Sequence, residues 1–148
     1  MDDVFPIAKE FAKLSNYSLN IVNLQNLLFI SQLLFIGEIG KKLFSANIVA
    51  GNYYPIIPVI YDYFLEQNID RYAIDSFYFR RIKDLDNESK KEFIQDIWNS
   101  VKGLSEKETF YLTVVEGGAW KTIKKNGRLD KTLSANDLKQ EYETVWKE

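Results

Sequence analysis

One segment, residues 19–39, is apolar on nearly every side when it is drawn as a helix, and it constrains the fold more than any other feature. A helix without a polar face has to be enclosed by other elements. The chain has 148 residues, of which 46% are hydrophobic, and this suits one domain with one core. We therefore expect a single compact domain over residues 1–148, built around a buried central helix that carries Ile21, Leu24, Leu27, Leu28, Phe29, Ile30, Leu33, Leu34, Phe35 and Ile36.

Shorter amphipathic segments precede and follow this helix. Residues 3–15 predict a helix that Asp2 or Asp3 caps, and residues 58–67 predict another that begins at a proline. A further helix is expected from about residue 86 until Gly103 ends it, and another after the capping box that begins at Ser105. Residues 119–125 are expected to form one more turn, and a last helix begins at Ser134. Residues 47–55 are β-branched and aromatic, which leaves room for a short extended segment or hairpin. The fold class is therefore mainly α, with six or seven short helices.

The chain contains no His and no Cys. Without imidazole it has no Ser-His-Asp triad, and without thiolate it has no Cys nucleophile, disulfide or Cys/His zinc site. No spaced acidic loop resembles a calcium-binding motif, and no glycine pattern is typical of a phosphate-binding loop. We therefore expect a protein that is not an enzyme, with no metal and no cofactor.

The charges favour neither nucleic acid nor membrane as a partner. The formal net charge is −2, and basic and acidic residues are interspersed along the chain. The cluster of Lys121, Lys124, Lys125 and Arg128 is interpreted as a solvated face, because acidic residues lie close to it in sequence. The longest apolar stretch, residues 27–36, is only ten residues and is interrupted by Ser31 and Gln32, so it is shorter than a spanning helix. The acidic start does not resemble a secretory signal. A cytoplasmic location is expected.

Residues 71–83 follow neither a helical nor a strand period, and extended structure is the modest favourite there. Aromatic side chains alternate in this stretch with Arg71, Arg80 and Arg81. Tyr and Arg dominate the residues that contribute most to protein–protein binding. Two interpretations stand equally: a segment whose aromatic side chains complete the core, and an exposed arm that binds a partner.

Three segments together resemble a known family. Residues 24–32 (Leu-Gln-Asn-Leu-Leu-Phe-Ile-Ser-Gln), followed by Lys-Lys-Leu-Phe at 41–44, resemble the Leu-Gln-Lys-Leu-Leu-Tyr-Phe-Ala-Gln helix and Gly-Lys-x-Leu-Phe exit of the Panacea antitoxin domain. Residues 50–61 resemble its Ala-Trp-x-x-Gly-Pro-Val-x-Pro-x-x-Tyr motif, and residues 112–120 resemble a Leu-Thr-His segment that ends in Pro-Trp. The order and spacing agree over roughly residues 5 to 145, which indicates a divergent member of the family.

The chain departs from the family pattern at five positions. The residues found there are Asn26 for Lys, Gly51 for Trp, Tyr54 for Gly, Val114 for His and Ala119 for Pro. The matched positions themselves suit structural roles: Leu24, Gln25, Leu27, Leu28, Gln32, Pro55, Tyr61 and Trp120. Gln25 and Gln32 are seven residues apart on one helical face, where their amides are expected to hold the neighbouring loop. Specificity is expected elsewhere, on exposed surface.

The resemblance implies an antitoxin that neutralises a cognate toxin by direct protein contact, or a SocA-like adaptor that presents the toxin to a protease. Two alternatives are a phage-encoded inhibitor of a host or defence protein, and a regulator that binds nucleic acid. The residues expected to bind the partner are Tyr53, Tyr54, Phe77, Tyr78, Arg80 and Arg81.

Overall fold

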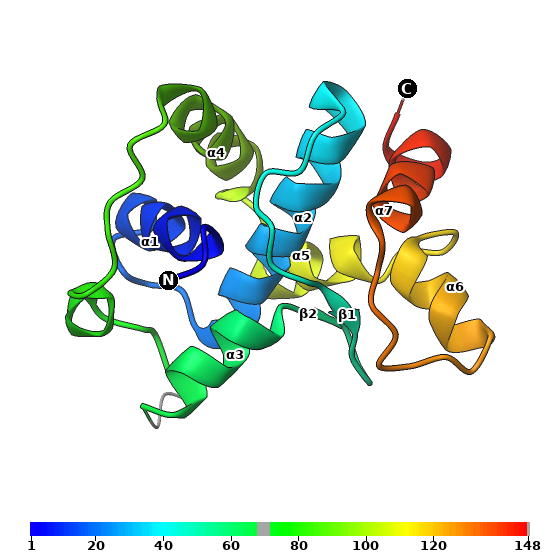
Figure 1. Cartoon of the computed structure of the whole chain (residues 1–148), viewed down its shortest axis with the longest axis horizontal. Coiled ribbons are helices and arrows are strands. Elements are labelled where there is room, and N and C mark those ends of the chain that lie inside the picture. Colours follow the sequence, from blue (N-terminus) through cyan, green and yellow to red (C-terminus); the bar gives the residue numbers. More distant parts are fainter. Residues whose placement is uncertain (68–71, 148) are drawn as a thin grey trace.

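A long helix, α2 (Ile21–Ile39), passes through the middle of the protein and is enclosed by the other elements (Figure 1). The structure is a computed structural model that describes residues 1–67 and 72–147. Helices α1 (Val4–Leu14), α3 (Pro58–Leu65), α5 (Glu106–Thr113) and α7 (Ala135–Glu141) all contact α2. Because α2 carries apolar side chains on every side, it can bury surface against several neighbours at once. The predicted mainly α fold around a central helix is confirmed.

The residues that flank α2 set both of its ends. The side-chain Oδ1 of Asn20 accepts a hydrogen bond from the Asn23 N–H at 2.9 Å, and Asn23 returns a bond to the Asn20 N–H at 3.4 Å. The helix ends at Gly40, whose φ of 83° lies in the left-handed region that favours glycine.

The length of α2 corrects one expectation from the sequence. By length and composition alone this helix could cross a membrane, so the expectation that every apolar segment is too short is wrong. Within its most apolar window, however, 72% of the residues are buried inside the protein. This burial identifies α2 as the core helix.

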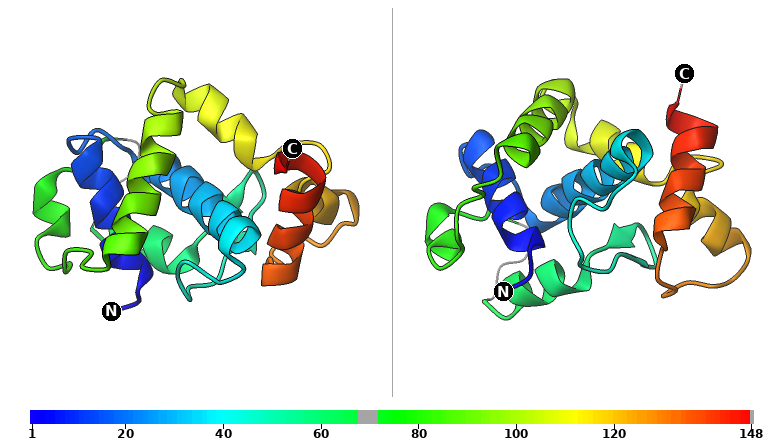
Figure 2. Two further views of the ribbon diagram at one scale, coloured as in Figure 1. Left: turned by 90° about the horizontal axis from the view of Figure 1, so that it is seen from above. Right: turned by 45° about the horizontal axis from the view of Figure 1, so that its top comes forward.

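Helices α1 and α4 (Glu88–Val101) pack together on one flank of α2, and α5 follows α4 across the top (Figure 2). Phe93 of α4 meets Phe35 of α2 edge to face, with ring centroids 5.0 Å apart. Asp3 occupies the N-cap position of α1, but its side chain does not cap the helix. Its Oδ1 instead accepts hydrogen bonds from the Ser45 N–H at 2.9 Å and the Ser45 hydroxyl at 3.0 Å. The expected capping role of Asp3 is therefore wrong, because the carboxylate ties the chain start to the loop after α2.

The opposite flank of α2 is covered by the end of the chain. Helix α6 (Ala119–Lys125) is followed by α7 and by a π-helical turn, η2 (Tyr142–Trp146). Ser134 and Asp137 form the capping box that opens α7, with hydrogen bonds of 2.8 and 3.0 Å. These elements place the C-terminal part of the chain beside α6 and α2 (Figure 1).

A small hairpin joins α2 to α3, as residues 47–55 predicted. Strands β1 (Val49–Ala50) and β2 (Pro55–Ile56) are antiparallel, with Val49 opposite Ile56. On the other side of β1, the Ala50 N–H donates to the Lys131 carbonyl at 2.8 Å, and the Asp130 N–H donates to the Ala50 carbonyl at 2.7 Å. The segment after α6 thus holds the hairpin from outside.

The stretch 72–83 is not extended. It contains a short 3₁₀ helix, η1 (Ser76–Phe79), which Asp75 opens by accepting a hydrogen bond from the Phe77 N–H at 3.0 Å. The expected extended structure is wrong because this side-chain cap starts a turn that bonds from residue i to i+3. Phe79 is buried, so one aromatic side chain of the stretch completes the core, while Phe77 is 57% exposed. The partner-binding role of the exposed side chains stays a prediction. Arg71 lies outside the described residues.

Candidate functional site

The two glutamines of α2 hold the chain between α2 and α3, which carries Tyr53 and Tyr54. Oε1 of Gln25 accepts from the Ile57 N–H at 2.7 Å, and its Nε2 donates to the Ile57 carbonyl at 3.4 Å. Gln32 accepts from the Leu43 N–H at 2.7 Å and donates to the Phe44 carbonyl at 2.7 Å. Both side chains are buried. Their amides therefore satisfy backbone groups between α2 and α3, as the seven-residue spacing predicted.

Trp120 fixes the turn of the hairpin. Its indole Nε1 donates to the Gly51 carbonyl at 2.7 Å, across 69 positions of sequence. A Cβ atom at Gly51 would lie 2.7 Å from the Tyr54 carbonyl oxygen, which is too close for any larger residue in this turn. Trp120 and Pro55 are buried and Tyr61 is half-buried, while Leu24, Leu27 and Leu28 lie in the core. The motif residues thus set the position of residues 51–54.

Tyr53 and Tyr54 occupy this fixed turn in different ways. Tyr53 is 77% exposed, whereas Tyr54 is half-buried and packs edge to face on Phe110, with centroids 5.8 Å apart. Burial raises the pKa of the Tyr54 hydroxyl above its ordinary value, and the nearby Tyr61 adds to the rise. Phe110 in turn contacts Tyr111, whose ring is 55% exposed. We call the four residues Tyr53, Tyr54, Phe110 and Tyr111 the hairpin–α5 surface.

A groove continues this surface between the start of α2 and α5. Its outer part, about 530 Å³, is lined by Val22, Phe110 and Tyr111, among others, and Lys107 lies with its Nζ 5.8 Å from the centre of the Tyr111 ring. Its inner part is a smaller cavity of about 150 Å³. Asn23 and Glu106 line both parts, so the two hollows are adjacent.

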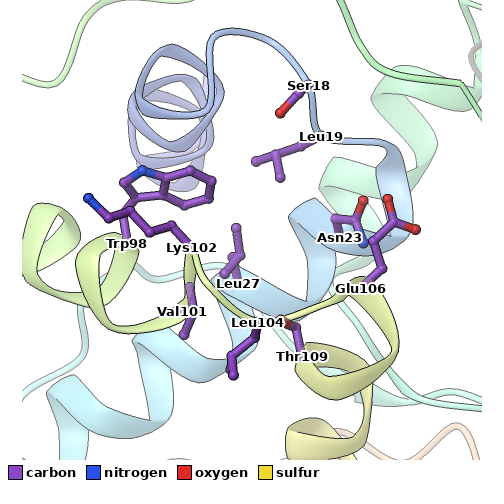
Figure 3. Close-up of a pocket in the computed structure, with 10 residues that line it drawn as sticks. All are labelled: Ser18, Leu19, Asn23, Leu27, Trp98, Val101, Lys102, Leu104, Glu106 and Thr109. Carbon is purple, nitrogen blue, oxygen red and sulfur yellow. The ribbon is translucent and has the colours of Figure 1, made fainter.

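The inner cavity is bounded by side chains from three elements (Figure 3). Figure 3 shows Trp98 of α4 and the adjoining Lys102 on one side and Asn23 and Glu106 on the other, with Leu27 of α2 between them. Its lining combines apolar side chains with one base, Lys102, and one acid, Glu106. Such a hollow fits one side chain of a protein partner rather than a whole small molecule.

The four remaining predicted binding residues lie on η1 or directly after it, away from the hairpin. Phe77 is 57% exposed, and the guanidinium carbon of Arg80 lies 3.7 Å from the centre of its ring. Arg80 also donates to the Phe77 carbonyl at 2.8 Å, while Tyr78 is half-buried against the core. Arg81 is exposed and lines a cavity of about 390 Å³ beside the chain start. We call Phe77, Tyr78, Arg80 and Arg81 the η1 surface.

The structure therefore divides the six predicted binding residues between two places. The hairpin turn and η1 lie at opposite ends of α3 (Figure 1). Phe110, Tyr111 and Trp98 were not anticipated as part of a site. One signal was present, because Phe110 and Tyr111 are consecutive in a helix, and neighbours about 100° apart cannot both face one core.

Within the part of the chain that the structure describes, no group of three or more acidic side chains is placed to hold a metal ion. The hairpin–α5 surface instead consists of aromatic side chains, and the η1 surface combines aromatic side chains with two arginines. Aromatic residues and Arg are enriched in protein interfaces.

Residues 24–121 match the family described as antitoxin SocA-like, Panacea domain. The match covers well over half of the chain and includes all eight motif residues, from Leu24 to Trp120. Comparisons with curated proteins and with solved structures found no match. The chain belongs to the family of SocA-like antitoxins that carry a Panacea domain.

Proposed function

We propose that this protein neutralises a cognate toxin by direct binding and carries out no catalysis. Membership of the SocA-like antitoxin family supports the antitoxin role. The composition supports binding, because the chain has neither His nor Cys for acid–base or nucleophilic chemistry. A toxin blocked in this way would remain intact and bound in the cytoplasm.

One observation supports the hairpin–α5 surface as the main contact. Tyr53 and Tyr111 expose 77% and 55% of their surface on either side of the half-buried pair of Tyr54 and Phe110. Exposed aromatic rings on a fixed backbone lose little conformational freedom when a partner covers them. The adjacent inner cavity offers a place for one anchoring side chain of the toxin.

The η1 surface is the second candidate contact. Phe77 exposes more than half of its ring, but Arg80 already covers one face of it and bonds to its carbonyl. A partner would therefore gain less new contact there than at the hairpin–α5 surface. We expect η1 to contribute less to the affinity.

Co-expression with the product of the adjacent gene tests the proposal. The antitoxin should restore growth and co-purify with that product. Replacing Tyr53 and Tyr111 by Ala should weaken the complex by more than about tenfold, because each is a candidate hot spot worth over about 1 kcal/mol. Tyr72→Ala is the matched control, since Tyr72 is also 77% exposed but lies outside both surfaces.

The same experiment separates the surfaces and the modes of action. A larger loss from Phe77→Ala with Arg80→Ala would move the main contact to η1. A toxin whose abundance falls on co-expression, and recovers when cellular proteases are inhibited, would indicate an adaptor instead of a blocker. Absence of both rescue and co-purification would refute the antitoxin proposal.

A further inference from the structure

One end of the molecule is basic although the chain as a whole is acidic. Residues 116–131 contain five Lys or Arg and two Asp or Glu, a net charge of +3, which leaves −5 for the rest of a chain of net charge −2. Four of the basic residues follow at helical spacing along α6 and just beyond it: Lys121, Lys124, Lys125 and Arg128. Trp120 and Ile123 face the core, so this basic stripe faces outward.

Only part of this charge is neutralised internally. Glu116 pairs with Lys125 at 2.9 Å and with Lys121 at 3.9 Å, and these lysines, Lys125 first, hold the pKa of its carboxyl below the usual range. Among the described residues, no acidic side chain lies within ion-pair distance of Lys124, Arg128 or Lys131. All three are exposed. Three positive charges are thus available to a partner.

The fold holds these charges beside the hairpin turn. The Lys131 carbonyl and the Asp130 N–H are both bonded to Ala50 of β1, at 2.8 and 2.7 Å. Lys124 places its Nζ 5.0 Å from the centre of the Trp120 ring, and Trp120 donates to Gly51 at the turn. The basic residues and the exposed Tyr53 are therefore carried by segments that are bonded to each other.

We propose that Lys124, Arg128 and Lys131 form a docking surface for an acidic segment of a protein partner, continuous with the hairpin–α5 surface; identifying that partner as the toxin rests on the proposed function. A protein is favoured over nucleic acid on two grounds. Three charges neutralise few phosphates, so they give little affinity for nucleic acid. The adjoining aromatic rings supply the apolar contact that a protein interface needs.

Binding of fluorescent poly-L-glutamate, at about 50 mM and about 200 mM salt, tests the surface without the toxin. The probe variant replaces Lys124, Arg128 and Lys131 by Glu. The control replaces Lys41, Lys42 and Lys83 by Glu, three exposed lysines elsewhere that give the same net charge. The probe variant should bind at least about tenfold more weakly than the control, with a flatter salt dependence.

Two results would overturn this inference. Equal weakening in both variants would show that net charge alone governs binding. Tighter binding of mixed-sequence duplex DNA than of poly-L-glutamate, lost only in the probe variant, would make the surface a nucleic-acid site. Circular dichroism of each variant establishes that it is folded.

A second test of the docking surface uses the toxin itself. If the adjacent gene product binds, the probe variant should lower the association rate constant by about tenfold, whereas Tyr53→Ala should mainly raise the dissociation rate constant. If the toxin binds and the probe variant leaves the association rate constant unchanged, the docking surface is refuted and the antitoxin proposal stays intact. Specific poly-L-glutamate binding without toxin binding would refute only the proposed function.

Discussion

Gln25 in the central helix binds both backbone polar groups of Ile57, the residue before α3. The amide oxygen accepts from the Ile57 N–H at 2.7 Å and the amide nitrogen donates to the Ile57 carbonyl at 3.4 Å. Both residues are fully buried, so neither backbone group could reach water if the side chain were removed. This amide therefore couples the core helix to the end of the hairpin that presents Tyr53 and Tyr54.

Replacing Gln25 by Leu should lower the free energy of unfolding by about 2 kcal/mol, because it leaves the buried Ile57 N–H without an acceptor. The Ile57 carbonyl keeps its bonds from the N–H groups of Ile60 and Tyr61, both at 3.1 Å. Gln95→Leu is the control, since Gln95 lies exposed on α4. Urea denaturation of both variants measures the difference. A Gln25→Leu protein as stable as Gln95→Leu would contradict this role of the amide.

Asn26, the next residue, should behave in the opposite way. Its side chain is fully buried, and neither Nδ2 nor Oδ1 has a hydrogen-bond partner among the described residues. Leu has the same number of side-chain heavy atoms as Asn in the same branched arrangement and carries no polar atom. Asn26→Leu should therefore raise the free energy of unfolding by about 1 kcal/mol. The same urea titration tests this, and a loss of stability would show that the amide does have a partner.

The sequence predicted those features that follow from periodicity and spacing. The central helix was predictable because apolar side chains on every side require burial. The roles of Gln25 and Gln32 were predictable because a seven-residue spacing puts both amides on one face, toward the chain that follows. Capping boxes at Ser105 and Ser134 marked two helix starts from local side-chain chemistry alone.

Features that depend on long-range contacts were not predictable from local pattern. Asp3 could cap its own helix, but its carboxylate instead accepts hydrogen bonds from Ser45, 42 positions away. The exposure of Tyr111 depends on which side of α5 faces α2, and the hairpin–α5 surface exists only once Tyr54 reaches Phe110. The π-helical turn at residues 142–146 likewise has no local signal in the sequence.

Gly37 should tolerate no side chain, although it lies inside a helix where Ala is usually favoured. A Cβ atom there would lie 2.1 Å from Cγ of the Tyr142 ring, so the ring packs directly on the helix backbone. Gly37→Ala should lower the melting temperature and cost about 2 kcal/mol through this overlap. Gly103→Ala is the control because nothing lies within 4 Å of its added Cβ. Equal melting temperatures for the two variants would show that Tyr142 does not pack there.

Glu141 should make stability depend on pH in the direction opposite to an ordinary ion-paired acid. Burial raises the pKa of its carboxyl, although the Trp146 indole and the Ala119 N–H, each at 2.8 Å, oppose the rise. The folded state then binds the proton more tightly than the unfolded state does. The unfolding free energy, relative to Glu141→Gln, should therefore fall as pH rises from the ordinary value of 4.5 to the raised pKa, and stay constant above it.

Thermal denaturation of the wild type and Glu141→Gln between about pH 4 and pH 8 measures this difference. Taking the difference removes the contributions of the exposed acids Asp84, Glu108 and Glu116, whose pKa values are lowered and which act in the opposite direction. A difference that rises with pH, or does not change with it, would contradict the burial of a carboxyl that its two hydrogen bonds compensate only in part.

Trp120→Phe should connect stability to partner binding. The variant leaves the buried Gly51 carbonyl without its 2.7 Å hydrogen bond, which should cost about 2 kcal/mol. It also releases the turn that carries Tyr53, so the dissociation rate of the complex should rise even at temperatures where the variant is fully folded. Trp98→Phe is the stability control, since the Trp98 indole N–H has no hydrogen-bond partner among the described residues. A Trp120→Phe protein that is less stable but binds as tightly as the wild type would show that the partner does not depend on the hairpin turn.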